Sequence, residues 1–398
     1  MKNPIKIVPG FRFSGIHCGI KERRKKDLAL IVADRPAKAV ACFTKNRVQA
    51  APVLQGKDVI RKGKLHAIVI NSGNANAVTG KQGLKNAYRT AKEAAKCLGA
   101  VPEQVLISST GKIGVPLDMK PIFEGLPRAV GRLSSQGWRE AAEAIKTTDA
   151  FVKVASRQGK VGNKMFTLTG IAKGAGMIEP NMATMLAYVL TDVDLPLPLM
   201  RSGFRKIVDQ TFNAVTVDGD TSTNDTALLW ANGLSGIRFS SKRSRGFAGF
   251  HKLLGEVCQD LAYQMVLDGE GATKVVGIEI SGASSDASAR KMAYAIANSQ
   301  LVKTSFFGED PNWGRVFAAI GYSGETFDPQ RVDISYGPVP LVRGGMPTSL
   351  SNEAKAHKLM KKEHFSIIVD LKQGRGTARL LTSDLGYEYV KINAEYRT

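Results

Sequence analysis

The most informative part of this chain is a glycine-rich segment that leads directly into an apolar run. Residues 173–190 read KGAGMIEPNMATMLAYVL. Glycine allows backbone conformations that other residues avoid, and the composition of Met185–Leu190 is typical of a buried strand. Thr184 lies where the two meet, between a predicted loop and a predicted strand. This position makes the hydroxyl of Thr184 the first candidate for chemistry.

A threonine at such a junction is suited to self-cleavage of the chain. Its hydroxyl can attack the carbonyl carbon of Ala183, and hydrolysis of the resulting ester leaves Thr184 with a free α-amine. That amine has an ordinary pKa of about 8, so it can act as the base that activates the neighbouring hydroxyl. The alternative is a glycine loop before a buried strand, in which Thr184 only favours β-structure.

The wider sequence resembles the ornithine acetyltransferase family, the glutamate N-acetyltransferases of arginine biosynthesis. The resemblance runs from end to end and is carried by ordered motifs. They are GFR at 10–12, DLALIV at 27–32, NSGNANA at 71–77, SSTG at 108–111, TTD at 147–149, residues 173–187, VDGDTSTND at 217–225, GEGA at 269–272, GEDPNWGR at 308–315 and INAEYRT at 392–398. So many long matches in order are specific, whereas one alone would not be.

Composition narrows the class of protein. The 398 residues are 43% apolar, which is enough to bury a sizeable core in one large domain or two. No run approaches the roughly 18 apolar residues of a membrane span, and the first residues lack the apolar stretch of a secretory signal. We therefore expect a cytoplasmic protein without a membrane anchor.

The net charge of +21 invites a nucleic-acid hypothesis. The basic residues form scattered clusters, such as those at 21–26, 61–64 and 242–245, rather than a stripe interleaved with aromatic residues. We therefore interpret them as a solvated basic surface and expect no nucleic-acid partner.

The sequence predicts no metal site. Cys18, Cys42, Cys97 and Cys258 are far apart and form no CxxC pair, so neither zinc binding nor a disulfide framework is indicated. The five histidines form no metal-spaced pair. We expect no metal and no dissociable cofactor.

Strand and helix patterns alternate along the chain. Val- and Ile-rich runs predict strands at 28–32, 39–43, 65–70, 105–108, 167–172, 185–190, 275–280, 366–371 and 377–382. Helical periodicity predicts helices at 84–98, 137–146, 197–211, 247–267 and 287–299. This mixture predicts an α/β or α+β fold. Residues 336–350, with two early prolines and a glycine pair, are predicted to form an exposed loop.

The family resemblance implies a layered sandwich similar to the N-terminal nucleophile hydrolases, cut between Ala183 and Thr184. An α chain of residues 1–183 would contribute the oxyanion hole and part of the substrate site. A β chain of residues 184–398 would begin with the nucleophile and contribute the rest. The two must stay packed together, because the apolar run after Thr184 would otherwise lose its core. A heterotetramer with two chains of each kind is expected.

Acetyl transfer from an amide needs a nucleophile, a proton acceptor and a site for the oxyanion. Thr184 would supply the first two. The resemblance assigns the oxyanion hole to Thr110 and Gly111, in a turn predicted to follow the strand at 105–108. A glycine there lets the backbone approach a ligand closely. The alternative is an ordinary turn at the end of a strand.

The resemblance also implies which residues bind substrate: Thr147, Lys173, Thr184, Glu270, Asn393 and Thr398. Lys173 suits a carboxylate, and Glu270, which stands between two glycines, suits the δ-ammonium of ornithine. Apolar residues from Tyr387 to Ile392 predict that the tail carrying Asn393 is held against the rest of the protein.

The implied reaction is a ping-pong transfer from N-acetylornithine to glutamate through an acetyl-Thr184 ester. Acetyl-CoA as a second acetyl donor is left open by the sequence. One alternative is a self-processing amidohydrolase or aminopeptidase of related fold, in which water replaces glutamate. A second is a non-catalytic basic nucleic-acid-binding protein, which would remain uncut.

Overall fold

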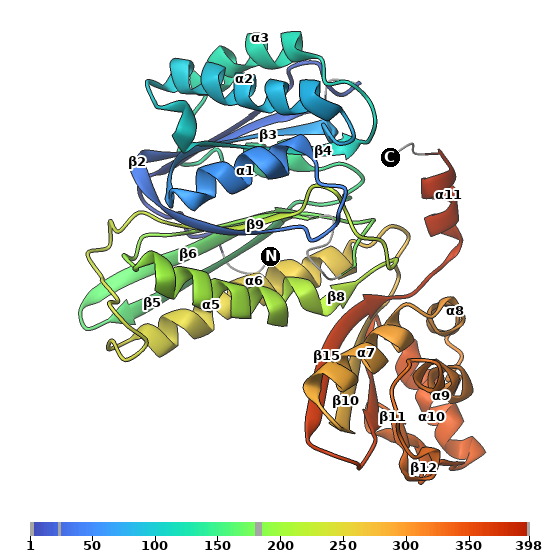
Figure 1. Ribbon diagram of the computed structural model, residues 1–398. Coiled ribbons are helices and arrows are strands. Elements are labelled where there is room, and N and C mark those ends of the chain that lie inside the picture. Colours follow the sequence, from blue (N-terminus) through green and yellow to red (C-terminus); the bar gives the residue numbers. More distant parts are fainter. Residues whose placement is uncertain (1–3, 23–24, 180–184, 396–398) are drawn as a thin grey trace. The chain divides into compact units, whose positions relative to one another are not determined.

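The computed structural model describes residues 4–22, 25–179 and 185–395 (Figure 1). The chain divides into two compact units, each considered by itself. The first is drawn from Met1–Asn213 and Asp220–Met265, and the second from Ala214–Gly219 and Val266–Arg397. Each unit contains one mixed β-sheet, so the predicted mixed α/β class is confirmed.

The first unit is built on a large sheet flanked by helices. Its strands are β1 (Phe11–Ile16), β2 (Leu28–Phe43), β3 (Lys64–Asn74), β4 (Val105–Lys112), β5 (Lys153–Val161), β6 (Lys164–Lys173), β7 (Leu186–Thr191) and β9 (Thr226–Ala231). Among the described residues they form an eight-stranded sheet in the order β4-β3-β2-β9-β7-β6-β5, with β1 paired to β2. Its helices are α1 (Ala51–Arg61), α2 (Gly80–Leu98), α3 (Met119–Val130), α4 (Trp138–Ile145), α5 (Leu197–Gln210) and α6 (Phe247–Leu267), with short 3-10 turns η1 (Pro102–Gln104) and η2 (Phe212–Ala214).

Strand β2 joins the two halves of this sheet. Its first part pairs with β1 and β3, its last part pairs with β9, and its register against β3 shifts between Val32 and Ala37. The sequence predicted two separate strands here, at 28–32 and 39–43, whereas the structure has one long strand. Because β2 passes from one half to the other, the sheet folds into two layers (Figure 1).

An apolar core fills the space between the two layers. Trp230 and Tyr188 from one layer and Ile31 and Ile68 from the other belong to one buried cluster. Helix α4 contacts β1 and β2 in one layer and β6 in the other. The core therefore lies in the same compact unit as the carboxyl ends of β4 and β6, which carry the candidate site.

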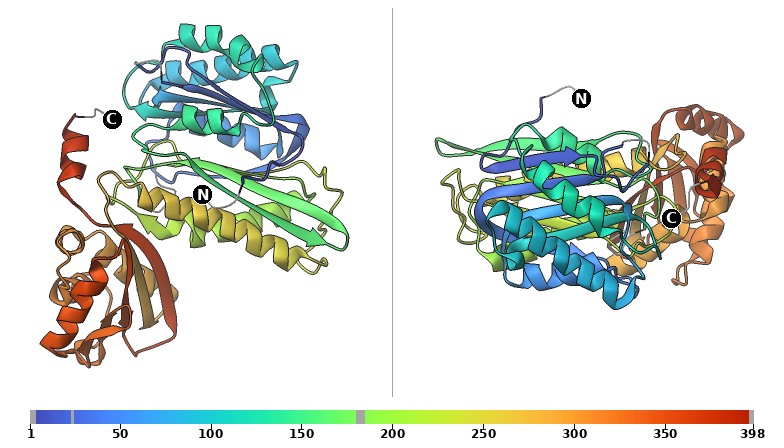
Figure 2. Two further views of the ribbon diagram at one scale, coloured as in Figure 1. Left: turned by 180° about the vertical axis from the view of Figure 1, so that it is seen from behind. Right: turned by 90° about the horizontal axis from the view of Figure 1, so that it is seen from above.

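Helices cover the outer faces of both layers. Helices α2 and α3 pack on the layer of β1 to β4, while α6 lies along β5 and β6 (Figure 2, left). Arg157 of β5 bridges to Asp260 of α6 at 2.5 Å and to Glu256 at 3.2 Å. A Cβ on Gly170 of β6 would lie 2.7 Å from Leu261, so the missing side chain lets the helix approach the sheet. The predicted helix at 247–267 is confirmed.

The second unit carries a smaller sheet. Its strands are β8 (Val215–Thr216), β10 (Val275–Ala283), β11 (Asp333–Tyr336), β12 (Val339–Arg343), β13 (Met346–Pro347), β14 (His364–Asp370) and β15 (Gly376–Ser383). Their order is β13-β12-β11-β14-β10-β15-β8. Its helices are α7 (Asp286–Ala297), α8 (Gln300–Phe307), α9 (Trp313–Gly321), α10 (Leu350–Met360) and α11 (Tyr387–Glu395), with the 3-10 turn η3 (Pro329–Arg331).

The prediction of an exposed loop at 336–350 is wrong. Strands β12 and β13 form a hairpin there, closed by Gly344 and Gly345, whose φ angles are +52° and +76°. Two consecutive residues with positive φ are the signature of a tight hairpin turn, so the glycine pair marks a turn between strands. Pro347 is tolerated because β13 lies at the edge of the sheet.

Two further expectations in the second unit are corrected. Asp310 followed by Pro311 predicts a cap and a helix start, whereas in the structure Asn312 caps α9 and its side chain accepts from the backbone N–H of Arg315 at 3.1 Å. The C-terminal segment forms α11, but Tyr387 is 84% exposed and Val390 is 65% exposed. The ring of Tyr387 still contacts Phe307 edge-on, with ring centroids 5.6 Å apart, so the apolar contact at the start of α11 is narrower than expected.

The proposed cleavage position, between Ala183 and Thr184, lies outside the described residues. The strands on either side of it pair with each other: β6 and β7 are antiparallel, with Lys173 opposite Leu186. Fragments 1–183 and 184–398 would therefore share one sheet, and the compact units do not coincide with them. Within the part of the chain that is described, no helix has the length and apolarity to cross a membrane.

Trp230 provides a test of the core between the layers. It is fully buried and contacts Phe11 edge-on, with ring centroids 5.0 Å apart. We expect Trp230→Ala to lower the free energy of unfolding by about 3–5 kcal/mol, because it leaves a large cavity. The shift of the urea midpoint measures this loss. Leu234→Ala, at a residue that is 59% exposed, is the control and should change the midpoint little; equal midpoints for the two variants would contradict this description of the core.

Candidate active site

Three of the residues that the sequence singled out meet in the first unit. Lys173, at the end of β6, is buried and donates from Nζ to Oγ1 of Thr147 at 2.9 Å. It also donates to Oγ1 of Thr110, on β4, at 3.3 Å. A hydroxyl that accepts from an ammonium keeps its own proton free to donate. The contact between Lys173 and Thr110 joins the two layers of the sheet at one point.

Gly111 stands at a position that no larger residue can occupy. Its φ is +129°, and a Cβ there would lie 2.4 Å from the carbonyl carbon of Gly73 on β3. The two glycines are opposite each other in the β3–β4 ladder. The predicted turn at 109–111 is wrong, because β4 continues through Lys112. The close approach of two backbones, rather than a turn, accounts for the glycine.

A buried carboxylate organises the residues around Lys173. Asp149 accepts from the backbone N–H of Thr147 at 2.9 Å and from that of Gly174 at 2.7 Å. It also forms an ion pair with Lys153 at 2.8 Å, and both side chains are fully buried. One carboxylate therefore ties the loop after α4, strand β5 and the end of β6 to one another.

The charge of Asp149 is maintained by its neighbours. Burial by itself would raise the pKa of this carboxyl, but the ammonium groups of Lys173 and Lys153 outweigh burial and hold the pKa well below its usual range. Asp149 is therefore ionised at neutral pH, and its negative charge lies against the positive charges of Lys173 and Lys153.

Amide side chains reinforce the end of β4. Asn224 donates from Nδ2 to the carbonyl oxygens of Ala75 at 2.6 Å and Ser109 at 2.8 Å. Ser109 donates to Asn71 at 2.6 Å. In the motif at 71–77, residues 71–74 are the end of β3 beside Thr110, and residues 75–77 form a hydrogen-bonded loop after it. Asn224, just before β9, thus ties the loop after β3 to β4.

A second buried carboxyl lies beside the start of β7. Asp225 is fully buried, and its Oδ1 accepts from the backbone N–H of Met185 at 3.0 Å. That N–H belongs to the peptide bond that joins residues 184 and 185. Burial raises the pKa of Asp225 well above its usual range, which the hydrogen bond from Met185 only partly offsets. The environment therefore favours the neutral acid.

The remaining candidates lie in the second unit or outside the described residues. Asn393 of α11 donates from Nδ2 to Glu270 at 2.8 Å, so these two are neighbours. Thr184, Ala183 and Thr398 are outside the described residues. No three His, Cys, Asp or Glu side chains come together as a metal-binding group in the described ranges.

The sequence predicts no role for Asp149, which ends the motif at 147–149, or for Lys153 and Lys21. The first two are four residues apart, which is the only linear sign of their ion pair. Lys21 opens a basic cluster that was interpreted as solvated surface. That interpretation is wrong for Lys21, because it is partly buried and its ammonium contacts the carbonyl oxygen of Lys146.

Hydroxyl groups, a close-packed glycine and a buried ammonium at one point are groups that acyl-transfer chemistry can use. The model of the ArgJ family matches residues 12–398, so this chain belongs to the ArgJ family.

Similar proteins are known over the whole length of the chain. The arginine biosynthesis bifunctional protein ArgJ of Geobacter sulfurreducens is 49% identical over 98% of this chain and 100% of its own length. A crystal structure of the ArgJ protein from Bacillus halodurans is 40% identical with a TM-score of 0.50, and covers 52% of this chain and 98% of that chain. The ornithine acetyltransferase of Mycobacterium tuberculosis, solved with ornithine, is 36% identical with a TM-score of 0.40, and covers 44% of this chain and 93% of that chain.

The buried ion pair gives a testable consequence for stability. We expect Asp149→Asn to lower the free energy of unfolding by about 3–5 kcal/mol at pH 7, because Lys153 loses its buried counter-charge. The folded pKa of Asp149 is below the unfolded value of about 3.9, so the wild-type advantage is complete above that value and shrinks as the pH falls below about 4.

Urea unfolding of both proteins at pH 7 and pH 3 measures the difference. Asp34→Asn is the matched control, because Asp34 pairs with Arg12 on the surface, where such a pair contributes only about 0–1 kcal/mol. A loss for Asp149→Asn no larger than that of the control would contradict the role of Asp149.

Proposed function

We propose that this protein is the acetyltransferase of arginine biosynthesis that moves the acetyl group from N-acetylornithine to glutamate. The observation that carries the proposal is the end-to-end likeness to bifunctional ArgJ proteins, 49% identical over 98% of the chain in the Geobacter relative. The meeting of Lys173 with Thr110 and Thr147 supports it from the structure. Since these relatives are called bifunctional, the proposal includes acetyl-CoA as a second donor of acetyl to glutamate.

In the proposed reaction, the Thr184 hydroxyl attacks the acetyl carbonyl carbon and its α-amine takes the hydroxyl proton. The tetrahedral oxyanion accepts hydrogen bonds from Thr110 and Gly111. The bond from carbon to the ornithine nitrogen then breaks, that nitrogen takes the proton, and an acetyl ester remains on Thr184. The α-amino group of glutamate then attacks the ester carbonyl carbon and gives a proton to the α-amine of Thr184. The bond from that carbon to the Thr184 oxygen breaks, the oxygen takes the proton, and N-acetylglutamate leaves.

The charged side chains fit the ends of these substrates. The buried ammonium of Lys173, beside the hydroxyl of Thr147, would receive a carboxylate. Glu270, hydrogen-bonded to Asn393, would receive the δ-ammonium of ornithine. Thr398 is proposed to complete the substrate site. No step in this scheme needs a metal or a dissociable cofactor.

We also propose that the mature enzyme consists of two chains, residues 1–183 and 184–398, assembled in the cytoplasm as a heterotetramer with two of each. The solved Bacillus halodurans chain supports the cut, because its match takes in 98% of that chain and only 52% of this one. That solved chain is therefore about half as long, although curated relatives match this chain over their full length.

Mass spectrometry tests cleavage and catalysis together. We expect the purified protein to give two masses, for residues 1–183 and 184–398, and N-acetylornithine to add one acetyl group to the second fragment. Thr184→Ala should give one uncut chain without transfer activity, because one hydroxyl serves both steps. Thr191→Ala, which changes a threonine at the end of β7, should be cut normally. An uncut wild-type chain that is fully active would contradict the mechanism, and acetate release without acetylglutamate would favour the hydrolase alternative.

The oxyanion role is tested at Thr110. We expect Thr110→Val to lower kcat by about 10²–10³, the usual cost of removing one such donor. Thr90→Val is the control, because Thr90 carries a buried hydroxyl that donates to the carbonyl oxygen of Asn86 within α2. Steady-state kinetics of both variants decide the matter, and an unchanged kcat for Thr110→Val would reject the assignment.

A further inference from the structure

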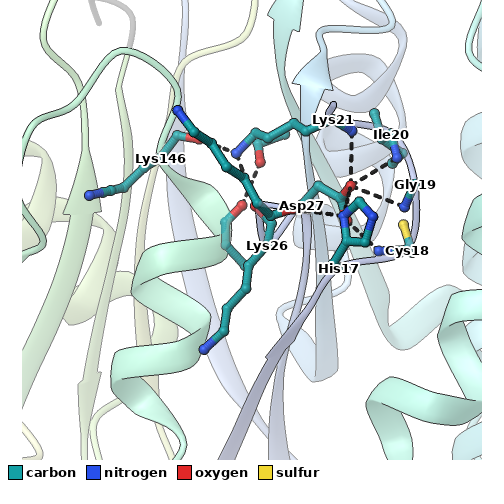
Figure 3. Close-up of polar contacts among 11 residues, drawn as sticks. His17, Cys18, Gly19, Ile20, Lys21, Lys26, Asp27 and Lys146 are labelled. Carbon is teal, nitrogen blue, oxygen red and sulfur yellow. Dashed lines mark hydrogen bonds and ion pairs between the residues drawn. The ribbon is translucent and has the colours of Figure 1, made fainter. Parts of the chain in front are cut away.

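One buried carboxylate holds the loop before β2. The side chain of Asp27 is fully buried and accepts four backbone N–H groups (Figure 3). The donors are Cys18 at 2.6 Å, Gly19 at 3.1 Å, Ile20 at 2.8 Å and Lys21 at 2.9 Å. Charge-assisted bonds of this kind are strong, so the backbone from which the Lys21 side chain leaves is fixed.

The stem of Lys21 packs beside the candidate oxyanion residues. A Cβ on Gly73 would lie 3.0 Å from Cγ of Lys21, so the aliphatic chain lies directly over this glycine. Gly73 is in turn opposite Gly111 in the ladder between β3 and β4. Lys21 therefore runs over the point where Gly111 approaches β3.

The ammonium of Lys21 ends on backbone carbonyl groups. It donates to the carbonyl oxygen of Lys146 at 2.5 Å and to that of Lys26 at 3.1 Å (Figure 3). Lys146 directly precedes Thr147. The side chain thus crosses from the loop held by Asp27 to the loop after α4.

Two opposite charges clamp one peptide group at this point. The C=O of the Lys146–Thr147 peptide accepts from Lys21, and the N–H of the same peptide donates to Asp149 at 2.9 Å. A peptide group is planar, so fixing its oxygen and its N–H fixes the plane and the start of residue 147. The ammonium sits at the negative end of the peptide dipole and the carboxylate at the positive end.

The clamped peptide carries a group of the candidate site. The Thr147 side chain accepts from Nζ of Lys173 at 2.9 Å. A displacement of the peptide would move this hydroxyl and remove a partner that positions the Lys173 ammonium. Lys21 therefore acts on Lys173 through Thr147.

We propose that Lys21 is a positioning residue of the substrate site: it holds the peptide before Thr147 and thereby sets where the Lys173 ammonium meets the substrate carboxylate. This inference rests on the proposed acetyl transfer. Because Lys21 acts on binding groups, its loss should raise KM for the amino-acid substrates and leave kcat nearly unchanged.

The surroundings of Lys21 distinguish it from a solvated lysine. Burial lowers the pKa of Lys21 to about 8; Asp27 and Asp149 oppose this shift, while the positive charges of Lys173 and Lys25 add to it. Above about pH 8 the amine is neutral and its bond to the carbonyl weakens, since it is no longer charge-assisted. Arginine stays charged throughout this range.

Steady-state kinetics of N-acetylornithine and glutamate at pH 7 and pH 9 test the inference. We expect Lys21→Met to raise KM about tenfold or more, as for the loss of a charged hydrogen bond, with kcat within about threefold. Lys21→Arg should keep KM near the wild-type value. Lys25→Met is the matched control, because it removes an exposed charge from the same loop and should change neither constant.

The pH dependence provides an independent readout. From pH 7 to pH 9 the wild-type KM should rise more than that of Lys21→Arg, while Lys21→Met should show a high KM at both values. Titration of the substrate amine is common to all three proteins and does not affect the comparison. If Lys21→Met does not fold, as judged by its melting curve, the comparison of wild type with Lys21→Arg still decides.

Three results would overturn the positioning role: a wild-type KM for Lys21→Met, an equal rise of KM for Lys25→Met, or the same pH response in wild type and Lys21→Arg. Failure of the proposed function has a different signature, because the wild-type enzyme would then transfer no acetyl group. In that case the dissociation constant of ornithine, measured by calorimetry for wild type and Lys21→Met, replaces KM as the test of Lys21.

Discussion

The Asp149 carboxylate is the group on which the candidate site depends. It joins a backbone N–H from the loop after α4, an ammonium from β5 and a backbone N–H at the end of β6. A buried charge costs free energy unless it is paired and hydrogen-bonded. Here the two N–H groups and the ammonium compensate the carboxylate. The positions of Thr147 and Lys173 therefore follow from an electrostatic network rather than from apolar packing alone. A network of this kind tolerates few substitutions, because each member satisfies another.

The folding of the sheet into two layers brings Thr110 next to the network around Asp149. Thr110 lies on β4 and Lys173 on β6, which are far apart in the order of the strands. Their contact at 3.3 Å requires the two layers to close on each other. Strand β2, which belongs to both halves, and the core around Trp230 keep the layers closed. Glycine at Gly111 has a separate cause, the close approach of its backbone to Gly73 on the adjacent strand β3.

Much of the fold followed from patterns in the sequence, and the exceptions have physical reasons. Long periodic segments, such as the helix at 247–267, were predicted with the bounds that the structure has. Strand β9 and helix α1 were missed, since each is mostly buried and lacks a clear alternation of polar and apolar residues. Thr110, Thr147 and Lys173 came from family resemblance, and the structure brings them together. The interaction of Lys173 with Asp149 was not predicted, because the sequence does not show whether an aspartate is buried or solvated. That difference depends on the fold.

The pairing of β6 with β7 affects how the protein unfolds and reassembles after cleavage. These strands flank the proposed cut, and their ladder is one of those that hold the first unit together. Once the bond is broken, the sheet no longer belongs to a single polypeptide. Unfolding then releases two separate molecules that must find each other again, so reassembly becomes a second-order process that depends on protein concentration. After cleavage, refolding would require the two chains to associate. The lifetime of the mature enzyme would then depend on how slowly the sheet opens.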